Sequence, residues 1–247
     1  MDHTLPKVTG TIDGHEFEVC HGTTLLEAAK TLGIKIPTLC HHPGLPPDGN
    51  CRLCLVETGD KLLASCAFPI RASGGVYLTH SPLVFEARAF VLKLLLSRAP
   101  NNKELLKLAE EYGAQADPRL SDDPDGCLRC ARCVRACQAA GSQAIALIGR
   151  GRGRKVAGPF FEPPLDCVGC LACARSCPTG LIACGEEPRV IWGRQFDLVK
   201  CPQCGRTVGT PEELKRAGIT SWLCPDCRRR EYSQALKNLP EASFVRN

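Results

Sequence analysis

Two short stretches of the chain, CLRCARCVRAC at residues 127–137 and CVGCLACARSCP at residues 167–178, decide its fold. Both have the cysteine spacing C-x2-C-x2-C-x3-C, which is typical of proteins that hold two [4Fe–4S] clusters. In such proteins the fourth cysteine of each run ligates the cluster of the other run. A pair of zinc knuckles is the alternative, and it is disfavoured because two copies of this pattern rarely arise by chance.

The repeat therefore predicts two ligand sets, each drawing on both runs. One departure from the usual pattern is that Gln138, rather than a proline, follows the first run. The predicted ligands are Cys127, Cys130, Cys133 and Cys177 for the first cluster, and Cys137, Cys167, Cys170 and Cys173 for the second.

A third group of cysteines lies toward the N-terminus and comprises Cys40, Cys51, Cys54 and Cys66. Thiolates are soft ligands suited to iron–sulfur clusters, and four of them suffice for a [2Fe–2S] centre. Prolines and glycines between the first two cysteines would let the backbone wrap closely and offer N–H groups to the sulfurs. We predict one [2Fe–2S] cluster here, with a zinc site or unpaired core thiols as the alternatives. The adjacent His41 and His42 are expected to be exposed or to lie behind the ligands.

A fourth group lies toward the C-terminus, where two C-x2-C pairs supply Cys201, Cys204, Cys224 and Cys227. Two such pairs suit one tetrahedral ion, as in a zinc ribbon. A rubredoxin-like iron is the alternative, and it is disfavoured because only Phe196 and Trp222 lie nearby as aromatic residues. The two remaining cysteines, Cys20 and Cys184, are expected to be buried free thiols.

Composition favours several small units over one large core. The chain has 247 residues, of which 44% are hydrophobic, 5% are aromatic and 18 are cysteine. Small domains need metals or other covalent supports to be stable. The net charge of +5 gives no nucleic-acid signature by itself, but basic residues gather at 150–155 and 228–230, where we expect docking patches.

No signal peptide is recognised, and the most apolar stretch, residues 83–96, is too short and too charged to span a bilayer. We therefore expect a cytoplasmic protein without membrane insertion, in a compartment that favours metal-bound cysteine over disulfides.

The pattern of turns and apolar residues predicts an α+β chain with four parts. Residues 1–80 should form a β-grasp ferredoxin domain, in which hairpins at 8–19 and 53–63 and a strand at 76–79 pack on a helix opened by the Thr24–Glu27 capping box. Residues 81–125 should form a helical linker with two helices. The first, at 83–96, is apolar on nearly every side and should therefore be buried between domains or against a partner, and the second lies at 103–112. The ferredoxin repeat takes residues 126–192, and a metal ribbon with a terminal helix at 231–239 takes residues 193–247.

We find no pattern for chemistry on a substrate. A Walker A lysine motif is absent from the sequence, and the glycine- and arginine-rich stretch at 149–154 does not sit in a dinucleotide-binding unit, so it is expected to be a flexible basic loop. Paired carboxylates and a Ser/His/Asp arrangement do not stand out either. The chain is thus predicted to be an electron-transfer subunit.

Four segments of the chain resemble the large iron–sulfur subunit of respiratory complex I. They are the stretch from Cys40 to Glu57, the run at 126–137, the segment Ile148-Gly-Arg-Gly151 and the stretch 167–180. They resemble equally the small diaphorase iron–sulfur subunit of NAD-reducing hydrogenases, and the likeness covers about residues 7–190. Members of this family usually carry a His-x3-Cys-x2-Cys-x5-Cys cluster motif between the two ferredoxin domains. Residues 96–114 contain no histidine and no cysteine, so we expect that cluster to be absent.

The resemblance implies an electron relay between a flavoprotein subunit that oxidises NAD(P)H and a catalytic subunit of the hydrogenase or formate dehydrogenase type. The terminal cysteine pairs are extra to the family core and resemble those of polyferredoxin subunits in formate hydrogenlyase-type complexes. Two other classes of function remain open at this point. One is a free-standing multi-cluster ferredoxin, although such carriers are usually acidic, and the other is a zinc scaffold or nucleic-acid-binding protein.

Overall fold

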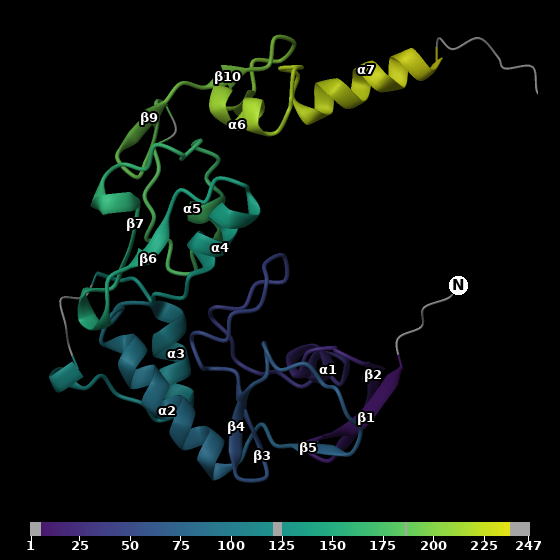
Figure 1. The fold of residues 1–247 in the computed structure, drawn as a ribbon, viewed down its shortest axis with the longest axis vertical. Helices are drawn as coiled ribbons and strands as arrows, with labels where there is room; N and C mark the ends of the chain where they lie inside the picture. Colours follow the sequence, from purple (N-terminus) through teal and green to yellow (C-terminus); the bar gives the residue numbers. More distant parts are fainter. Residues whose placement is uncertain (1–5, 121–124, 186, 238–247) are drawn as a thin grey trace, which may run out of the picture.

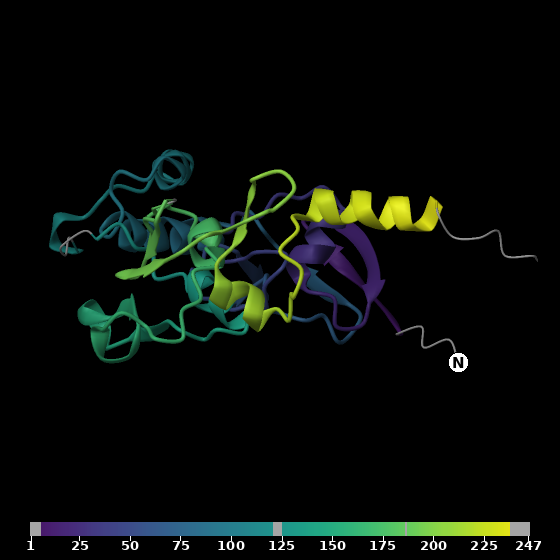
Figure 2. The ribbon, with the colours of Figure 1, turned by 90° about the horizontal axis from the view of Figure 1, so that it is seen from above.

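The computed structural model describes residues 6–120, 125–185 and 187–237. Figure 1 shows the parts of the chain following one another along an arc, with the first strands at one end and the last helix at the other. Seen from above in Figure 2, that last helix projects beyond the body of the molecule. The cysteine groups are therefore distributed along the arc in sequence order.

The N-terminal part contains a three-stranded sheet in the order β2-β1-β5. Strand β1 (Lys7–Ile12) pairs antiparallel with β2 (His15–Cys20) and parallel with β5 (Gly75–Tyr77). The helix α1 (Leu25–Thr31) begins with the predicted capping box, and its buried face packs in the same core as Ile12 and Phe17. A second hairpin joins β3 (Leu55–Thr58) to β4 (Lys61–Ala64).

Two helices follow, α2 (Pro82–Leu96) and α3 (Lys103–Glu111). The expectation that α2 is buried between domains or against a partner is met only in part within this chain. One face of α2 is buried, including Arg88 and Leu92, whereas Phe90 on the other face is 59% exposed. Figure 1 shows α3 along one side of α2 and the β3–β4 hairpin near its beginning.

The central part contains α4 (Arg132–Ala139) and α5 (Ala172–Ser176), one after each C-x2-C loop of the repeat. The two halves share backbone geometry, since Ala131 and Leu171, which each directly follow the second cysteine of a run, both have positive φ, at 57° and 62°. The stretch at 149–154 does not stand alone as a loop, because β6 (Ala146–Ile148) and β7 (Lys155–Ala157) flank it as an antiparallel hairpin. Short 3-10 turns occur at Pro118–Leu120, Gly151–Gly153 and Pro159–Phe161.

A further hairpin, absent from our sequence interpretation, pairs β8 (Arg189–Ile191) with β9 (Arg194–Phe196). The domain boundary predicted at 192/193 falls in the two-residue turn of this hairpin, so the hairpin belongs to both predicted parts. The division of the chain into four domains otherwise stays a prediction.

The C-terminal part contains a hairpin of β10 (Val199–Lys200) and β11 (Thr207–Gly209), then α6 (Pro211–Arg216) and α7 (Pro225–Lys237). The terminal helix was expected at 231–239. It begins earlier, at Pro225 within the last cysteine pair, and positions 238 and 239 lie outside the described residues.

One smaller expectation is contradicted. Cys20 and Cys184 are exposed, so the expectation that they are buried thiols is wrong. Within the described ranges, the structure has no helix long and apolar enough to cross a membrane.

Candidate iron–sulfur and metal sites

The N-terminal cysteine group is gathered by a wrapping loop and the β3–β4 hairpin. Cys40 and Cys51 lie at the two ends of the loop, and each backbone N–H donates to the other's sulfur at 3.4 Å. Cys54 directly precedes β3 and Cys66 follows β4, which places their sulfurs 3.3 Å apart. The exposed fraction of all four residues is 7% or less.

The thiols of this group share hydrogen bonds that move their pKa values apart. Hydrogen bonds from the Cys51 and Cys66 thiols hold the pKa of Cys40 well below the usual thiol range, although burial raises it, whereas the same contacts and burial raise the pKa values of Cys51 and Cys66. Metals and clusters bind thiolates rather than thiols, and backbone N–H groups aimed at sulfur are a common feature of cluster sites. The neighbouring histidines do not join the four sulfurs in these contacts, and His42 Nδ1 instead accepts a hydrogen bond from the N–H of Gly44 at 3.1 Å.

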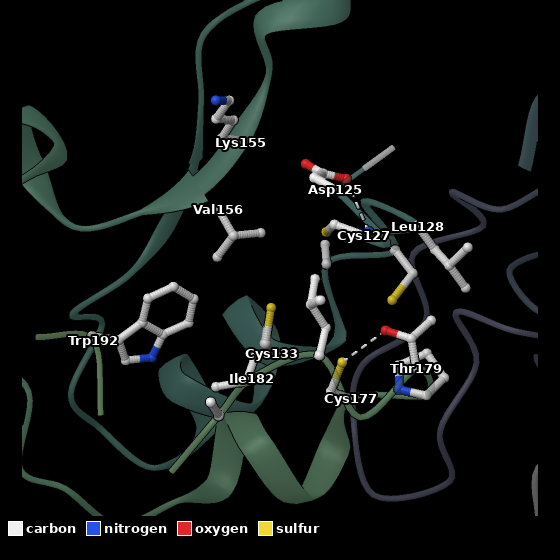
Figure 3. Close-up of a pocket in the computed structure, with 15 residues that line it drawn as sticks. Asp125, Cys127, Leu128, Cys133, Lys155, Val156, Cys177, Thr179, Ile182 and Trp192 are labelled. Carbon is white, nitrogen blue, oxygen red and sulfur yellow. Dashed lines mark hydrogen bonds between the residues drawn. The ribbon is translucent and has the colours of Figure 1, made fainter. Parts of the chain in front are cut away.

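The first set predicted from the repeat lines a cavity of about 320 Å³, shown in Figure 3. Cys177 from the second run lies against the same cavity as the cysteines of the first run, as the crossed ligand pattern requires. The backbone N–H of Arg129 donates to the Cys127 sulfur at 3.4 Å, and the Thr179 hydroxyl lies 3.3 Å from the Cys177 sulfur. The four thiols around this cavity are Cys127, Cys130, Cys133 and Cys177.

The second predicted set lines a separate, smaller cavity beside the first. Cys137 of the first run joins the three leading cysteines of the second run, and its sulfur accepts a hydrogen bond from the N–H of Ala144 at 3.3 Å. The indole N–H of Trp192 donates to the Cys173 sulfur at 3.4 Å. The thiols that line this cavity are Cys137, Cys167, Cys170 and Cys173.

The C-terminal group differs because its four sulfurs are close enough for a single ion. They all lie within 4.8 Å of one another, and among the described residues this is the one group gathered in that way. Four sulfurs at about 2.3 Å from a zinc ion would be roughly 3.8 Å apart, and the sulfurs of Cys204 and Cys224 are 3.6 Å apart. The arrangement therefore suits a tetrahedral ion. Zinc and iron both fit such a set, and the choice between them stays a prediction.

The C-terminal part packs directly on the loop that carries the second cavity's cysteines. Arg194 on β9 donates to the carbonyl of Cys167 at 2.7 Å, and Arg189 on β8 donates to the carbonyl of Gly169 at 2.9 Å. Thr210, the residue before α6, donates its hydroxyl to the carbonyl of Val168 at 2.5 Å. The β8–β9 hairpin and the residue before α6 thus support the 167–170 loop from outside.

The wrapping loop of the N-terminal group contacts α4 of the repeat. Arg135 is 9% exposed and donates to the carbonyls of Cys40 and Pro46, both at 2.5 Å. Asn50 donates from its side chain to the carbonyl of Arg129 at 2.7 Å. Sequence reasoning missed these contacts. The one available signal was a charged residue, Arg135, lying midway between two predicted ligands.

One buried apolar cluster connects the N-terminal cysteine group with the first cavity of the repeat. It includes Cys40 and Cys51 from the former and Cys130 from the latter, together with apolar residues of α2 and α3 such as Leu92 and Leu105. The thiols of the two groups are therefore not separated by solvent.

Comparison with known proteins gives three kinds of match. Residues 6–77 match the model of the 2Fe-2S iron-sulfur cluster binding domain. The chain is 34% identical to an NADH-quinone oxidoreductase subunit of Rhizobium meliloti, over 79% of this chain and 26% of that protein. It is 35% identical to the NADP-reducing hydrogenase subunit HndD of Solidesulfovibrio fructosivorans, over 76% of this chain and 37% of that protein.

Among solved structures, a chain of an NAD+-reducing [NiFe]-hydrogenase in the H2-reduced state aligns with a TM-score of 0.54 and 31% identity, covering 62% of this chain and 75% of that one. This chain spans only 26% and 37% of the length of the two curated relatives named above.

Proposed function

Since the chain belongs to the family of iron–sulfur subunits found in complex I and in NAD-reducing hydrogenases, we propose that it relays single electrons inside such a multisubunit oxidoreductase. The observation that carries the proposal is the continuous buried cluster that joins Cys40 and Cys51 to Cys130. Electron hops between redox centres are favoured where packed protein, rather than solvent, lies between them. A centre that is bound in each of the first three thiol sets would accept and donate one electron at a time.

We assign one [2Fe–2S] cluster to the N-terminal group and two [4Fe–4S] clusters to the repeat. The donor sets support this assignment, because each offers four thiols, an apolar surround and N–H groups directed at sulfur. The protein's own residues hold the thiols in place, keep water from the space between the first two groups and supply hydrogen bonds to sulfur.

We further propose that the C-terminal set holds a structural zinc ion. Zinc has no redox chemistry, so this ion would not take part in the relay. The ion would hold the β10–β11 hairpin and the last two helices together. Thr210, the residue before α6, would then stay in place to donate to the 167–170 loop, which Arg189 on β8 also contacts.

For the partners, we propose a flavoprotein subunit that oxidises NAD(P)H and a catalytic subunit of the hydrogenase or formate dehydrogenase type. The names of the relatives support the first, because they include NADH-quinone oxidoreductase and NADP-reducing hydrogenase subunits. The exposed apolar face of α2 offers a surface for such contacts, with Phe90 59% exposed and Leu83 40% exposed. A cytoplasmic location stays a prediction.

The test is metal and sulfide analysis of the full chain purified without oxygen, together with a search for subunits that co-purify. We expect about ten irons per chain, from two plus four plus four, with matching acid-labile sulfide, and one zinc. Reduced protein should show electron paramagnetic resonance (EPR) signals of one [2Fe–2S] and two [4Fe–4S] centres. Zinc in place of iron, with no sulfide, would contradict the relay.

A further inference from the structure

The turn of the β8–β9 hairpin places an unusual residue at its tip. Ile191 pairs with Arg194, which leaves Trp192 and Gly193 as the two turn residues, with φ of 53° and 75°. Two successive positive φ values characterise the type I′ turn, whose first position strongly prefers asparagine, aspartate or glycine. A bulky aromatic residue is a real outlier in this conformation, and such strain persists where the surrounding structure enforces it.

The surroundings of the hairpin supply that constraint. Ile191 and Phe196 are each only 2% exposed and lie in the same buried cluster as Cys133, Cys137 and Cys173. The hairpin is therefore anchored in the core of the cysteine repeat, and its tip cannot relax without moving these residues.

The strained position puts the indole between the two cavities of the repeat. Trp192 lines the first cavity, as Figure 3 shows, and it also lines the second. Its N–H donates to the sulfur of Cys173 at 3.4 Å. Within the described part of the chain, Trp192 supplies the only side-chain nitrogen that donates to a cysteine sulfur. On the other side, the hydroxyl of Thr179 lies against the sulfur of Cys177.

We propose that Trp192 is a positioning residue that raises the reduction potential of the cluster held by Cys173. Reduction adds negative charge to a cluster and its sulfurs, so a hydrogen-bond donor at sulfur stabilises the reduced form more than the oxidised form. The half-buried ring also separates the two cavities and keeps water from the Cys173 sulfur. This inference rests on the assignment of two [4Fe–4S] clusters made above.

The test compares W192F with the wild-type chain in a redox titration followed by EPR. Phenylalanine keeps an aromatic ring but removes the N–H. We expect the reduction equilibrium constant of one [4Fe–4S] couple to fall about tenfold, which is a shift of about 59 mV to lower potential for one electron, and the other couple to stay in place. Unchanged potentials for both couples in W192F would overturn the inference.

Two further variants locate the effect. T179V removes the hydroxyl beside Cys177 and should shift the other couple, while W222F changes the exposed second tryptophan and should shift neither. A shift of the same couple in T179V and W192F would also overturn the inference, because the two side chains contact different thiol sets.

Iron and sulfide content is measured first for each variant. If W192F loses a cluster, the same titration is made on W192N. Asparagine tolerates a positive φ but is too short to reach the sulfur. An unchanged reduction potential in W192N would contradict the inference. If the wild-type chain itself lacks two [4Fe–4S] centres, the proposed function is contradicted. Failure of the proposed function can therefore be distinguished from failure of the inference about Trp192.

Discussion

Replacing Arg135 by alanine should loosen the contact between the wrapping loop and α4. The guanidinium makes two hydrogen bonds of 2.5 Å, to the carbonyls of Cys40 and Pro46, and the residue is 9% exposed. A hydrogen bond to a charged group contributes about 1.5–3 kcal/mol. Because water would replace part of the lost interaction, we take roughly 3 kcal/mol for the pair, which corresponds to about a hundredfold change in an equilibrium constant.

The assay is amide hydrogen exchange on the intact, cluster-loaded chain, after its iron content has been matched to wild type. In R135A we expect the amides of the loop 41–50 to exchange about a hundredfold faster, because local opening no longer breaks the two bonds. R132A is the matched control. Arg132 lies on the same helix but makes a longer contact, 3.4 Å to the carbonyl of Leu39, so its effect should be only a few-fold. Equal protection of the loop in R135A and wild type would refute the reasoning.

Three smaller perturbations test other parts of the structure. Asp13 accepts hydrogen bonds from the N–H and hydroxyl of the buried Thr79, so D13A should lower the free energy of unfolding by about 1–3 kcal/mol, and an unchanged melting temperature would contradict this. Burial raises the pKa of Asp13, but the Thr79 hydrogen bonds outweigh it and hold the pKa below the usual value, so this stabilisation is present above about pH 4 and is lost as the pH falls below it. T24A removes the cap of α1 and should cost about 1 kcal/mol, measured by denaturant titration against a K35A surface control; a loss no larger than the control's would count against the cap. C224S should release one zinc per chain while iron stays at the wild-type level, and a parallel loss of iron would show that the two kinds of site depend on each other.

The cysteine groups were the most predictable part of the chain, because ligand spacing is a local property of the sequence. The repeat spacing predicts that each run supplies the fourth thiol of the other set, and the thiols that line the two cavities follow that crossed pattern. Their role as ligands stays a prediction. The capping box at Thr24 and Glu27 could also be predicted from the sequence, since both partners lie within four residues. The identity of the bound groups is not settled by this agreement and stays a prediction.

The features that the sequence did not reveal depend on tertiary contacts. The hairpin β8–β9 was missed because its turn has tryptophan where asparagine would signal a turn. It is stabilised by tertiary contacts, namely the burial of Ile191 and Phe196 and the hydrogen bonds of its arginines to the 167–170 loop. For helix α2, residue type alone does not tell which apolar side chains are covered by this chain and which are left for a partner. Phe90 and Leu94 lie outside the buried cluster and are 59% and 39% exposed.

Two buried arginines donate hydrogen bonds to backbone carbonyls at or next to the cysteines of the proposed [2Fe–2S] site. Arg88 on α2 is fully buried and donates to the carbonyl of Leu55, the residue after Cys54, at 2.8 Å, while Arg135 on α4 donates to the carbonyl of Cys40. Within the described residues, no ion pair with a carboxylate is found for either guanidinium. Both guanidiniums are hydrogen-bonded, since Arg88 also donates to the Tyr112 hydroxyl at 2.8 Å, and a nearby anion would further offset the cost of burying their charge. Four thiolates around two irons and two sulfides leave a net negative charge. A cluster held by these cysteines would therefore supply an anion next to the backbone that both arginines bind, which is an electrostatic argument independent of cysteine spacing.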